Sequence, residues 1–186
     1  MRYLIAACAL LALAACHKST QPAVNQNVSV ATEEGGKGLD RSHKGQPFPT
    51  VQFTDPDGTM TSYAGFRGAP TLVNLWATWC IPCIKELPTL DKLGKEKKAD
   101  LWVVPINQDM APEASVEAFL KLHKLDIPDY RDPKMKVSAA LGAEVLPTSI
   151  LFGSNGKEVW RYVGDLDWTS PEAAKLLAEA SATAAH

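Results

Sequence analysis

The feature that most constrains the fold is an apolar segment that leads directly into two closely spaced cysteines. Residues 71–76 have the sequence TLVNLW, and Cys80 and Cys83 follow, separated by two residues. A nearly continuous apolar run of this length predicts a strand that is buried on both faces. Residues 84–93, directly after the second cysteine, are predicted to form a helix. The two cysteines therefore lie at the junction of a buried strand and a helix.

This junction suits reversible thiol–disulfide chemistry. The start of a helix has unpaired backbone N–H groups and the positive end of the helix dipole. We expect Cys80 to have a lowered pKa there and to act as the nucleophile. Cys83, one helical turn further on, is placed to attack a mixed disulfide on Cys80 and to release the product. Pro82 is compatible with the first turn of the helix, where no backbone N–H is needed.

A zinc site and a purely structural disulfide both fit the cysteine pair less well. A zinc site needs a second pair of ligands, and the four histidines of the chain are not paired at ligand spacing. A structural disulfide with a two-residue spacer closes a strained loop and removes little chain entropy. A redox pair is therefore the preferred interpretation, and no metal site is expected.

The first residues have the features of an export signal. Residues 1–2 are a short basic region, and residues 3–13 are an apolar run too short to span a bilayer. Residues 13–16, Leu-Ala-Ala-Cys, resemble the lipobox of bacterial lipoproteins. On that resemblance, residues 1–15 are a signal peptide, and a lipid on Cys16 anchors the protein to a membrane. Ordinary signal cleavage, with a leftover cysteine, is the alternative.

The cysteine count and the charge are consistent with an exported enzyme. Of the four cysteines, Cys8 lies in the predicted signal and Cys16 is assigned to the lipid, which leaves one pair. A single dithiol with no other cysteine to exchange with suits a periplasmic redox enzyme. The formal net charge of −2 gives no basic patch, so no nucleic-acid partner is expected.

Residues 16–45 are expected to form the lipidated N-terminus and a flexible linker, and residues 46–186 one domain. The linker is rich in polar residues and glycine, and such a segment cannot bury enough apolar surface to offset its ordering entropy. Residues 46–186 have the length of one ordinary domain. Pro88 is expected to bend the helix after the cysteines. The remaining expected elements are a hairpin over 46–63, strands over 101–106 and 127–131, helices over 109–124, 133–141 and 171–182, and a hairpin turn at 154–157.

The segment LVNLWATWCIPC at residues 72–83, with Glu86 and Pro88, resembles the thioredoxin superfamily. More narrowly, it resembles the TlpA/ResA/CcmG branch of redoxin-type, membrane-anchored thiol-disulfide oxidoreductases. The resemblance extends over residues 46–186. It implies an α/β thioredoxin fold, in which a mixed central sheet is flanked by helices, with an N-terminal β-hairpin extension and a central insertion.

The resemblance also implies roles for a proline and its neighbour. Pro147, in the sequence Val-Leu-Pro-Thr, corresponds to the cis-proline that faces the cysteine pair in this family. A proline there directs no N–H at the sulfurs and leaves the Leu146 backbone free to pair with an extended substrate. A trans proline in a turn before a strand is the alternative.

Two polar positions refine the expected mechanism. Simple thioredoxins have a buried aspartate where this chain has Asn74, which cannot take up a proton. Glu86 stands where the ResA-like branch has a functional glutamate. If it is buried, its pKa is raised and it holds or relays the proton of Cys83. An exposed helix carboxylate is the alternative.

Three residues next to the cysteines are expected to contact the substrate. Trp79 is expected to shield Cys80 and to line the contact surface. Ile81 and Pro82, between the cysteines, are expected to lie on the same surface and to influence the balance between dithiol and disulfide.

The resemblance thus implies a protein-disulfide reductase that is exported, tethered to the inner or outer membrane and located in the bacterial periplasm. It would act as a monomer without a bound cofactor. Electrons would come from a membrane thiol transporter of the DsbD/CcdA type and pass to disulfides of exported proteins, with cytochrome c maturation as one family role.

Three further functions remain open. A peroxiredoxin-like peroxidase shares the extended fold but has its cysteine in another sequence context. A copper-handling protein of the Sco type needs a longer cysteine spacer and a distal histidine ligand. A non-catalytic binding module on a thioredoxin scaffold would not need the two sulfurs.

Overall fold

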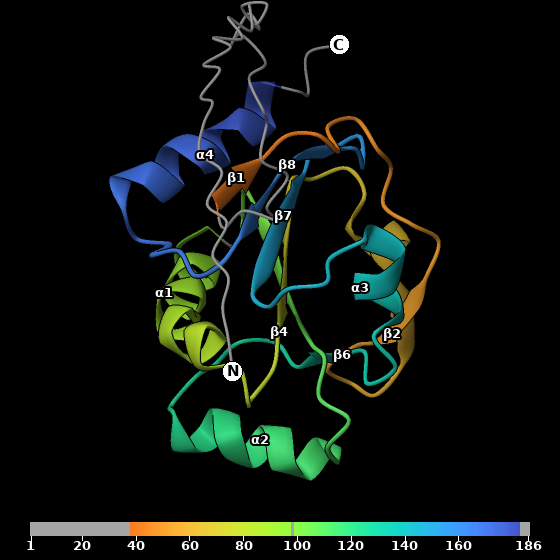
Figure 1. The fold of residues 1–186 in the computed structure, drawn as a ribbon, viewed down its shortest axis with the longest axis vertical. Helices are drawn as coiled ribbons and strands as arrows, with labels where there is room; N and C mark the ends of the chain where they lie inside the picture. The colour runs from red at the N-terminus through yellow and green to blue at the C-terminus, as the bar shows by residue number, and fades with distance from the viewer. Residues whose placement is uncertain (1–37, 98, 183–186) are drawn as a thin grey trace, which may run out of the picture. The chain divides into compact units, whose positions relative to one another are not determined.

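A computed structural model describes residues 38–97 and 99–182, and within these residues the strands form one mixed sheet with helices on both faces (Figure 1). The strands are β1 (Gly38–Asp40), β2 (Gln52–Thr54), β3 (Met60–Ser62), β4 (Thr71–Trp76), β5 (Trp102–Asn107), β6 (Tyr130–Arg131), β7 (Thr148–Phe152) and β8 (Glu158–Val163). The helices are η1 (Tyr63–Phe66), α1 (Ile81–Lys97), α2 (Glu113–Leu122), α3 (Lys136–Leu141) and α4 (Pro171–Ala182). Across the sheet the order is β1-β8-β7-β4-β5-β6-β2-β3.

The central strand β4 is buried over its whole length, as its apolar sequence predicts. It pairs in parallel with β5 and antiparallel with β7. Because side chains alternate along a strand, Leu72 and Trp76 enter the apolar core on one face, and Val73 and Leu75 enter the core on the other. Each face of the sheet therefore has its own core.

The two cores are closed by different elements. The first includes α1, α2 and α4, whose buried residues Leu87, Leu90, Val116 and Leu176 pack against β4, β7 and β8. The second core lies under residues 48–54, η1 and α3. Its members include Phe48, Phe53, Phe66, Val137 and Leu141. Figure 1 shows α1 and α4 on one side of the sheet and α3 on the other.

The predicted elements are present, and several of them have shifted ends. α1 begins at Ile81 rather than at residue 84 and continues to Lys97. Pro88 lies inside this helix, and the bend expected there stays a prediction. β6 covers two residues of the expected 127–131, because Pro128 has no N–H to donate to a neighbouring strand. It still joins the N-terminal hairpin to the sheet, since it pairs with both β5 and β2.

The predicted linker, residues 16–45, includes residues at its C-terminal end that belong to the folded domain. Gly38–Asp40 forms β1, which pairs antiparallel with β8 at the edge of the sheet, and the Gly45 N–H donates to the Glu158 carbonyl at 2.8 Å. Composition does not reveal this edge strand, because backbone groups hold it. Residues 1–37, with the predicted signal and Cys16, lie outside the described residues. Within the described part, no helix is long and apolar enough to cross a membrane.

Candidate active site

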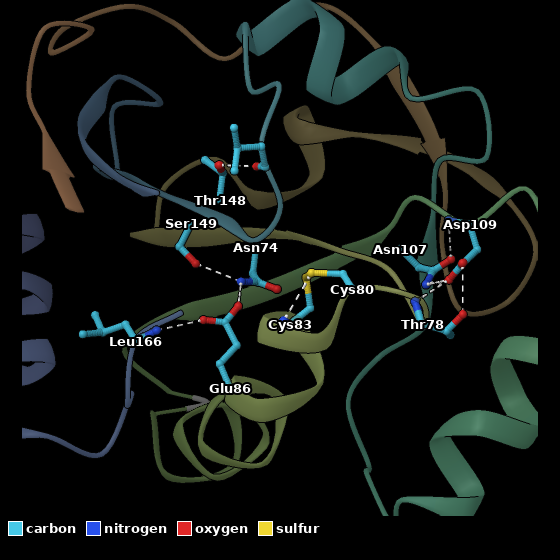
Figure 2. Close-up of a disulfide and its surroundings, with 11 residues drawn as sticks. Asn74, Thr78, Cys80, Cys83, Glu86, Asn107, Asp109, Thr148, Ser149 and Leu166 are labelled. Atoms are coloured by element: carbon cyan, nitrogen blue, oxygen red, sulfur yellow. Dashed lines mark hydrogen bonds between the residues drawn. A yellow bond between two sulfur atoms is a disulfide. The ribbon is translucent and has the colours of Figure 1, made fainter. Parts of the chain in front are cut away.

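Cys80 and Cys83 lie where β4 passes into α1, and a disulfide joins them (Figure 2). The Cys80 carbonyl accepts from the Ile84 N–H at 3.1 Å, so Cys80 is the residue that caps the start of α1. The Cys83 N–H donates to the Cys80 sulfur at 3.3 Å. Cys80 is 6% exposed and Cys83 is fully buried. Cys80 is therefore the more accessible sulfur-bearing residue, at a helix end that favours negative charge.

The carboxyl group of Glu86 is buried one helical turn beyond Cys83, and the residue is 2% exposed. Asn74 Nδ2 donates to its Oε1 at 2.6 Å, and the Leu166 N–H donates to its Oε2 at 3.2 Å. Burial raises the pKa of Glu86 from 4.5 to about 7, although the hydrogen bonds from Asn74 and Leu166 oppose this shift. The Glu86 carboxyl group is therefore buried and is not an exposed helix carboxylate, and its raised pKa lies near neutral pH.

Asn74 projects from the middle of β4 into the space between the sheet and α1. It lies on the same face of β4 as Leu72 and Trp76 and directly opposite Ser149 of β7. Its Nδ2 donates to Ser149 Oγ at 2.8 Å as well as to Glu86. Its Oδ1 is buried and has no hydrogen-bond partner among the described residues. One strand side chain thus connects α1 and β7 beside the cysteine pair (Figure 2).

Asp109 holds the loop that precedes Cys80. Its Oδ2 accepts from the Thr78 N–H at 2.8 Å, and its Oδ1 accepts from the Thr78 hydroxyl at 3.0 Å. Asn107, the last residue of β5, donates to Asp109 Oδ2 at 2.7 Å and accepts from the Asp109 N–H at 3.0 Å. β5 runs parallel to β4, so its end lies beside the cysteine loop. These three residues form a polar clamp on the backbone before the nucleophile.

The Leu146–Pro147 peptide bond is cis, as the family resemblance implied. β7 begins at Thr148, which pairs with Leu75 near the end of β4. Because β4 and β7 are antiparallel, the loop before β7 and the loop after β4 lie at the same end of the sheet. Thr148 Oγ1 donates to the Val145 carbonyl at 2.7 Å and closes the turn that contains the proline. Pro147 and Leu146 therefore lie at the end of the sheet that bears the cysteines.

Large apolar side chains are exposed on these loops and at the first residue of α1. Trp79 is 64% exposed, Ile81 79%, Met110 81% and Val145 47%. We call these four residues the apolar rim. Pro82 is exposed as well. Single exposed apolar residues are ordinary, but four of them around one reactive pair give this end of the sheet an apolar surface.

The structure brings most of the predicted site residues together at one end of the sheet. They are Cys80, Cys83, Glu86, Trp79, Ile81, Pro82, Leu146 and Pro147. The predicted lipidation site, Cys16, lies outside the described residues. Within residues 38–97 and 99–182, no three His, Cys, Asp or Glu residues are grouped so that they could hold a metal ion.

The clamp and part of the apolar rim are not among the residues predicted from the sequence. The available signal was the polar run Asn107-Gln108-Asp109, which comes directly after a buried parallel strand next to the strand that bears the cysteines. Polar side chains at the carboxyl end of such a strand lie near the site. Met110, which follows that run, had no sequence signal of its own, and neither did Ser149.

Comparison with known proteins agrees with this geometry. Residues 43–177 match the Redoxin family model. The chain is 30% identical over 122 residues to the thiol-disulfide oxidoreductase ResA of Bacillus cereus, which covers 65% of this chain and 70% of that protein. It is 34% identical over 138 residues to the thiol:disulfide interchange protein DsbE of Pseudomonas fluorescens, covering 72% and 76%.

The fold is shared with a solved structure, the exposed lipoprotein thioredoxin of Streptococcus pneumoniae. The TM-score is 0.59 at 24% identity, and the likeness covers 69% of this chain and 98% of that one. At that identity it shows the fold alone. The family match, the two relatives and the Cys80–Cys83 disulfide together identify the chemistry. The chain belongs to the Redoxin family and is a thiol-disulfide oxidoreductase of the ResA/DsbE/TlpA-like type with a thioredoxin fold.

Proposed function

We propose that the chain is an exported reductase of protein disulfides in which Cys80 is the attacking nucleophile. The observation that carries this proposal is the arrangement of the pair, with Cys80 at the accessible start of α1 and Cys83 buried one turn before Glu86. In the reduced protein, the Cys80 thiolate attacks one sulfur of a partner disulfide. A mixed disulfide forms, and the other partner sulfur leaves as a thiolate.

Cys83 then completes the exchange. Its thiol gives its proton to the Glu86 carboxylate, and the resulting thiolate attacks the Cys80 sulfur. The Cys80–Cys83 bond forms, and the partner's second sulfur leaves as a thiolate. A Glu86 pKa of about 7 suits this role, because it is closer to the pKa of a thiol than the pKa of an ordinary carboxyl group is. The dithiol itself carries the two electrons, so no separate cofactor is required.

The apolar rim and the loop at Leu146–Pro147 are proposed to receive the partner chain. Trp79, Ile81 and Pro82 offer apolar contacts next to the reactive sulfur, and all three are exposed. The Leu146 backbone offers hydrogen bonds to an extended segment. We therefore expect good substrates to have apolar residues in extended chain next to their disulfide.

We further propose that the protein works as a monomer in the bacterial periplasm, tethered to the inner or the outer membrane through a lipid on Cys16. The support is the basic and apolar leader that ends in Leu-Ala-Ala-Cys. A reductase in an oxidising compartment needs a continuous supply of electrons. A membrane thiol transporter of the DsbD/CcdA type would supply them, and cytochrome c precursors are one class of acceptor.

The test combines a potential with a trapping experiment, on a chain in which Cys8 and Cys16 are replaced by serine. We expect the Cys80–Cys83 pair to have a reduction potential near about −270 mV, whereas a value near about −120 mV would overturn the reductive direction. The Cys83→Ser variant should accumulate a mixed disulfide with an oxidised peptide, and Cys80→Ser should not. The opposite pattern would assign the nucleophile to Cys83.

The same trapping assay distinguishes substrates. Oxidised peptides with the Cys-x-x-Cys-His sequence of cytochrome c precursors are compared with peptides that have the same disulfide and polar or apolar flanks. We expect apolar flanks to raise the rate of trapping. Equal rates for all flanks would exclude the apolar rim as the contact surface.

A further inference from the structure

The hydrogen bonding of Asn74 is incomplete in the oxidised protein. The residue is fully buried, and its Nδ2 donates to both Glu86 and Ser149. Its Oδ1 has no donor among the described residues. Buried carbonyl oxygens are nearly always paired, so an unpaired one next to a reactive centre points to a partner that is present in another state.

The position of Asn74 determines what that partner is. Cys83 and Glu86 are three residues apart in α1, so they lie on one face of the helix, one above the other. That face packs against β4, and Asn74 Nδ2 reaches the Glu86 end of it. The other atom of the amide, Oδ1, points toward the disulfide in Figure 2.

The orientation of the amide is set by its neighbours. If the amide were flipped, Oδ1 would face an ionised Glu86 oxygen at 2.6 Å, and two acceptors would oppose each other. With Nδ2 on Glu86, the oxygen is left facing the sulfurs. The arrangement with the ionised carboxylate therefore directs an acceptor at the cysteine pair.

We propose that Asn74 is a positioning residue of the reduced state, in which its Oδ1 accepts a hydrogen bond from the Cys83 thiol while its Nδ2 holds Glu86. In the disulfide, Cys83 has no S–H to donate. Reduction by the dithiol donor breaks the S–S bond and adds two electrons to the pair. One of the donor's two protons goes to the Cys83 sulfur, and the other is released to solvent, so Cys80 is left as the thiolate. This inference rests on the proposed function, because it concerns the thiol that resolves the mixed disulfide.

An amide suits this position better than a carboxyl group. It accepts the S–H hydrogen bond without binding a proton itself, so Glu86 is left as the proton acceptor. A second carboxylate at the same place would compete with Glu86 for one proton. Asn74 therefore orders the Cys83 thiol and its proton acceptor from a single strand residue.

The test is the infrared S–H stretching band of Cys83 in the full chain. The difference spectrum between Cys80→Ser and the Cys80→Ser/Cys83→Ser double variant isolates this band. We expect the band at lower frequency than that of a free thiol, and we expect Asn74→Leu to shift it upward to the free value. Ser149→Ala is the matched control. It removes the uncharged partner of Asn74 Nδ2 and leaves Oδ1 in place, so the frequency of the S–H band should not change. An unchanged band in Asn74→Leu would overturn the proposal.

A second measurement needs no change at Asn74 and so does not depend on the folding of a variant. On reduction of the unsubstituted chain, the carboxamide carbon of Asn74 should shift downfield in its NMR spectrum, because its oxygen gains a donor. No shift would overturn the proposal. Neither readout involves turnover, so failure of the proposed reductase function would be seen separately, in the potential and in the trapping assay.

Discussion

At the scale of single residues, the carboxyl group of Glu86 has the environment that departs most from ordinary solvent. It lies between α1 and β4, held by a side-chain amide and a backbone N–H. Neutral donors stabilise its ionised form only in part, and burial raises its pKa to about 7. The site thus contains a carboxyl group that gains and loses a proton in the pH range where thiol exchange takes place.

This burial predicts a pH-dependent stability. The folded pKa lies above the unfolded value of 4.5, so the folded state binds the proton more tightly, and stability falls as pH rises from about 4.5 through about 7. The shift corresponds to about 3 kcal/mol. Glu86→Gln should lack this loss, so its stability relative to the unsubstituted chain should increase by about that amount between pH 4 and pH 8.

Urea unfolding of the two oxidised chains over this pH range provides the measurement. Asp129, whose pKa burial raises to about 6, titrates in both chains and cancels in the difference. Parallel pH profiles for the two chains would show that ionised Glu86 costs the folded state nothing.

The carboxylate of Asp109 predicts a different effect, on the loop before the nucleophile. Asp109→Ala would leave the Thr78 N–H and the Asn107 amide without their acceptor, which should cost about 2–4 kcal/mol. Thr78→Val removes only the hydroxyl bond and should cost about 1 kcal/mol. Chemical unfolding of both variants tests this order, and equal losses would contradict a clamp centred on the carboxylate.

At the scale of elements, the proline loop is supported from β8. The guanidinium group of Arg161 donates to both oxygens of Glu158 at 2.8 Å and to the carbonyl of Leu141 at 2.9 Å. Both charged residues are buried. Leu141 is the last residue of α3, and the chain continues from it into the turn at Leu146–Pro147. The ion pair therefore connects a sheet strand to the helix that leads into the site.

Removal of one partner of this ion pair should lower the stability of the folded chain far more than removal of both. Arg161→Met leaves the Glu158 carboxylate buried without its cation and should destabilise the chain by about 3–5 kcal/mol. The double variant Arg161→Met/Glu158→Leu should recover much of that loss, because no charge then stays buried alone. Denaturant midpoints of the single and double variants provide the measurement, and an additive double variant would argue against this coupling.

At the scale of the whole domain, the sheet begins at β1, before residue 46, where the composition predicts that the domain starts. β1 covers the outer edge of β8 through three residue pairs, from Gly38 opposite Val163 to Asp40 opposite Arg161. Without β1, β8 would be an edge strand with unpaired N–H and C=O groups, which favours aggregation. The folded unit therefore includes part of what composition assigns to the linker.

This arrangement predicts a difference between two soluble fragments. A fragment of residues 46–186 lacks β1 and should be less stable than a fragment of residues 35–186 by about 1–3 kcal/mol, the contribution of three cross-strand pairs. It should also aggregate at lower temperature. Thermal unfolding followed by light scattering compares the two, and identical curves would show that β1 contributes nothing to the domain.

Local sequence determined much of this protein. The apolar run at residues 71–76 is β4, the cysteines begin the next helix, and Pro171–Ala182 is the final helix with the predicted bounds. These features depend on apolar periodicity, turn residues and a short motif. Each of these lies within a few neighbouring positions and is visible in the chain itself. The redox pair and the raised pKa of Glu86 were within reach for the same reason, with the family resemblance added.

Tertiary structure alone decided how the site is held. Asn74 meets Ser149 across 75 positions of sequence, and Thr78 meets Asp109 across 31. Such pairs depend on the order and register of the strands, and a linear pattern does not encode which polar residues will face each other. The pairing of β1 with β8 is set in the same way, by backbone groups that look alike in every sequence. The reactive sulfurs are thus a property of the motif, whereas the hydrogen bonds that position them are a property of the fold.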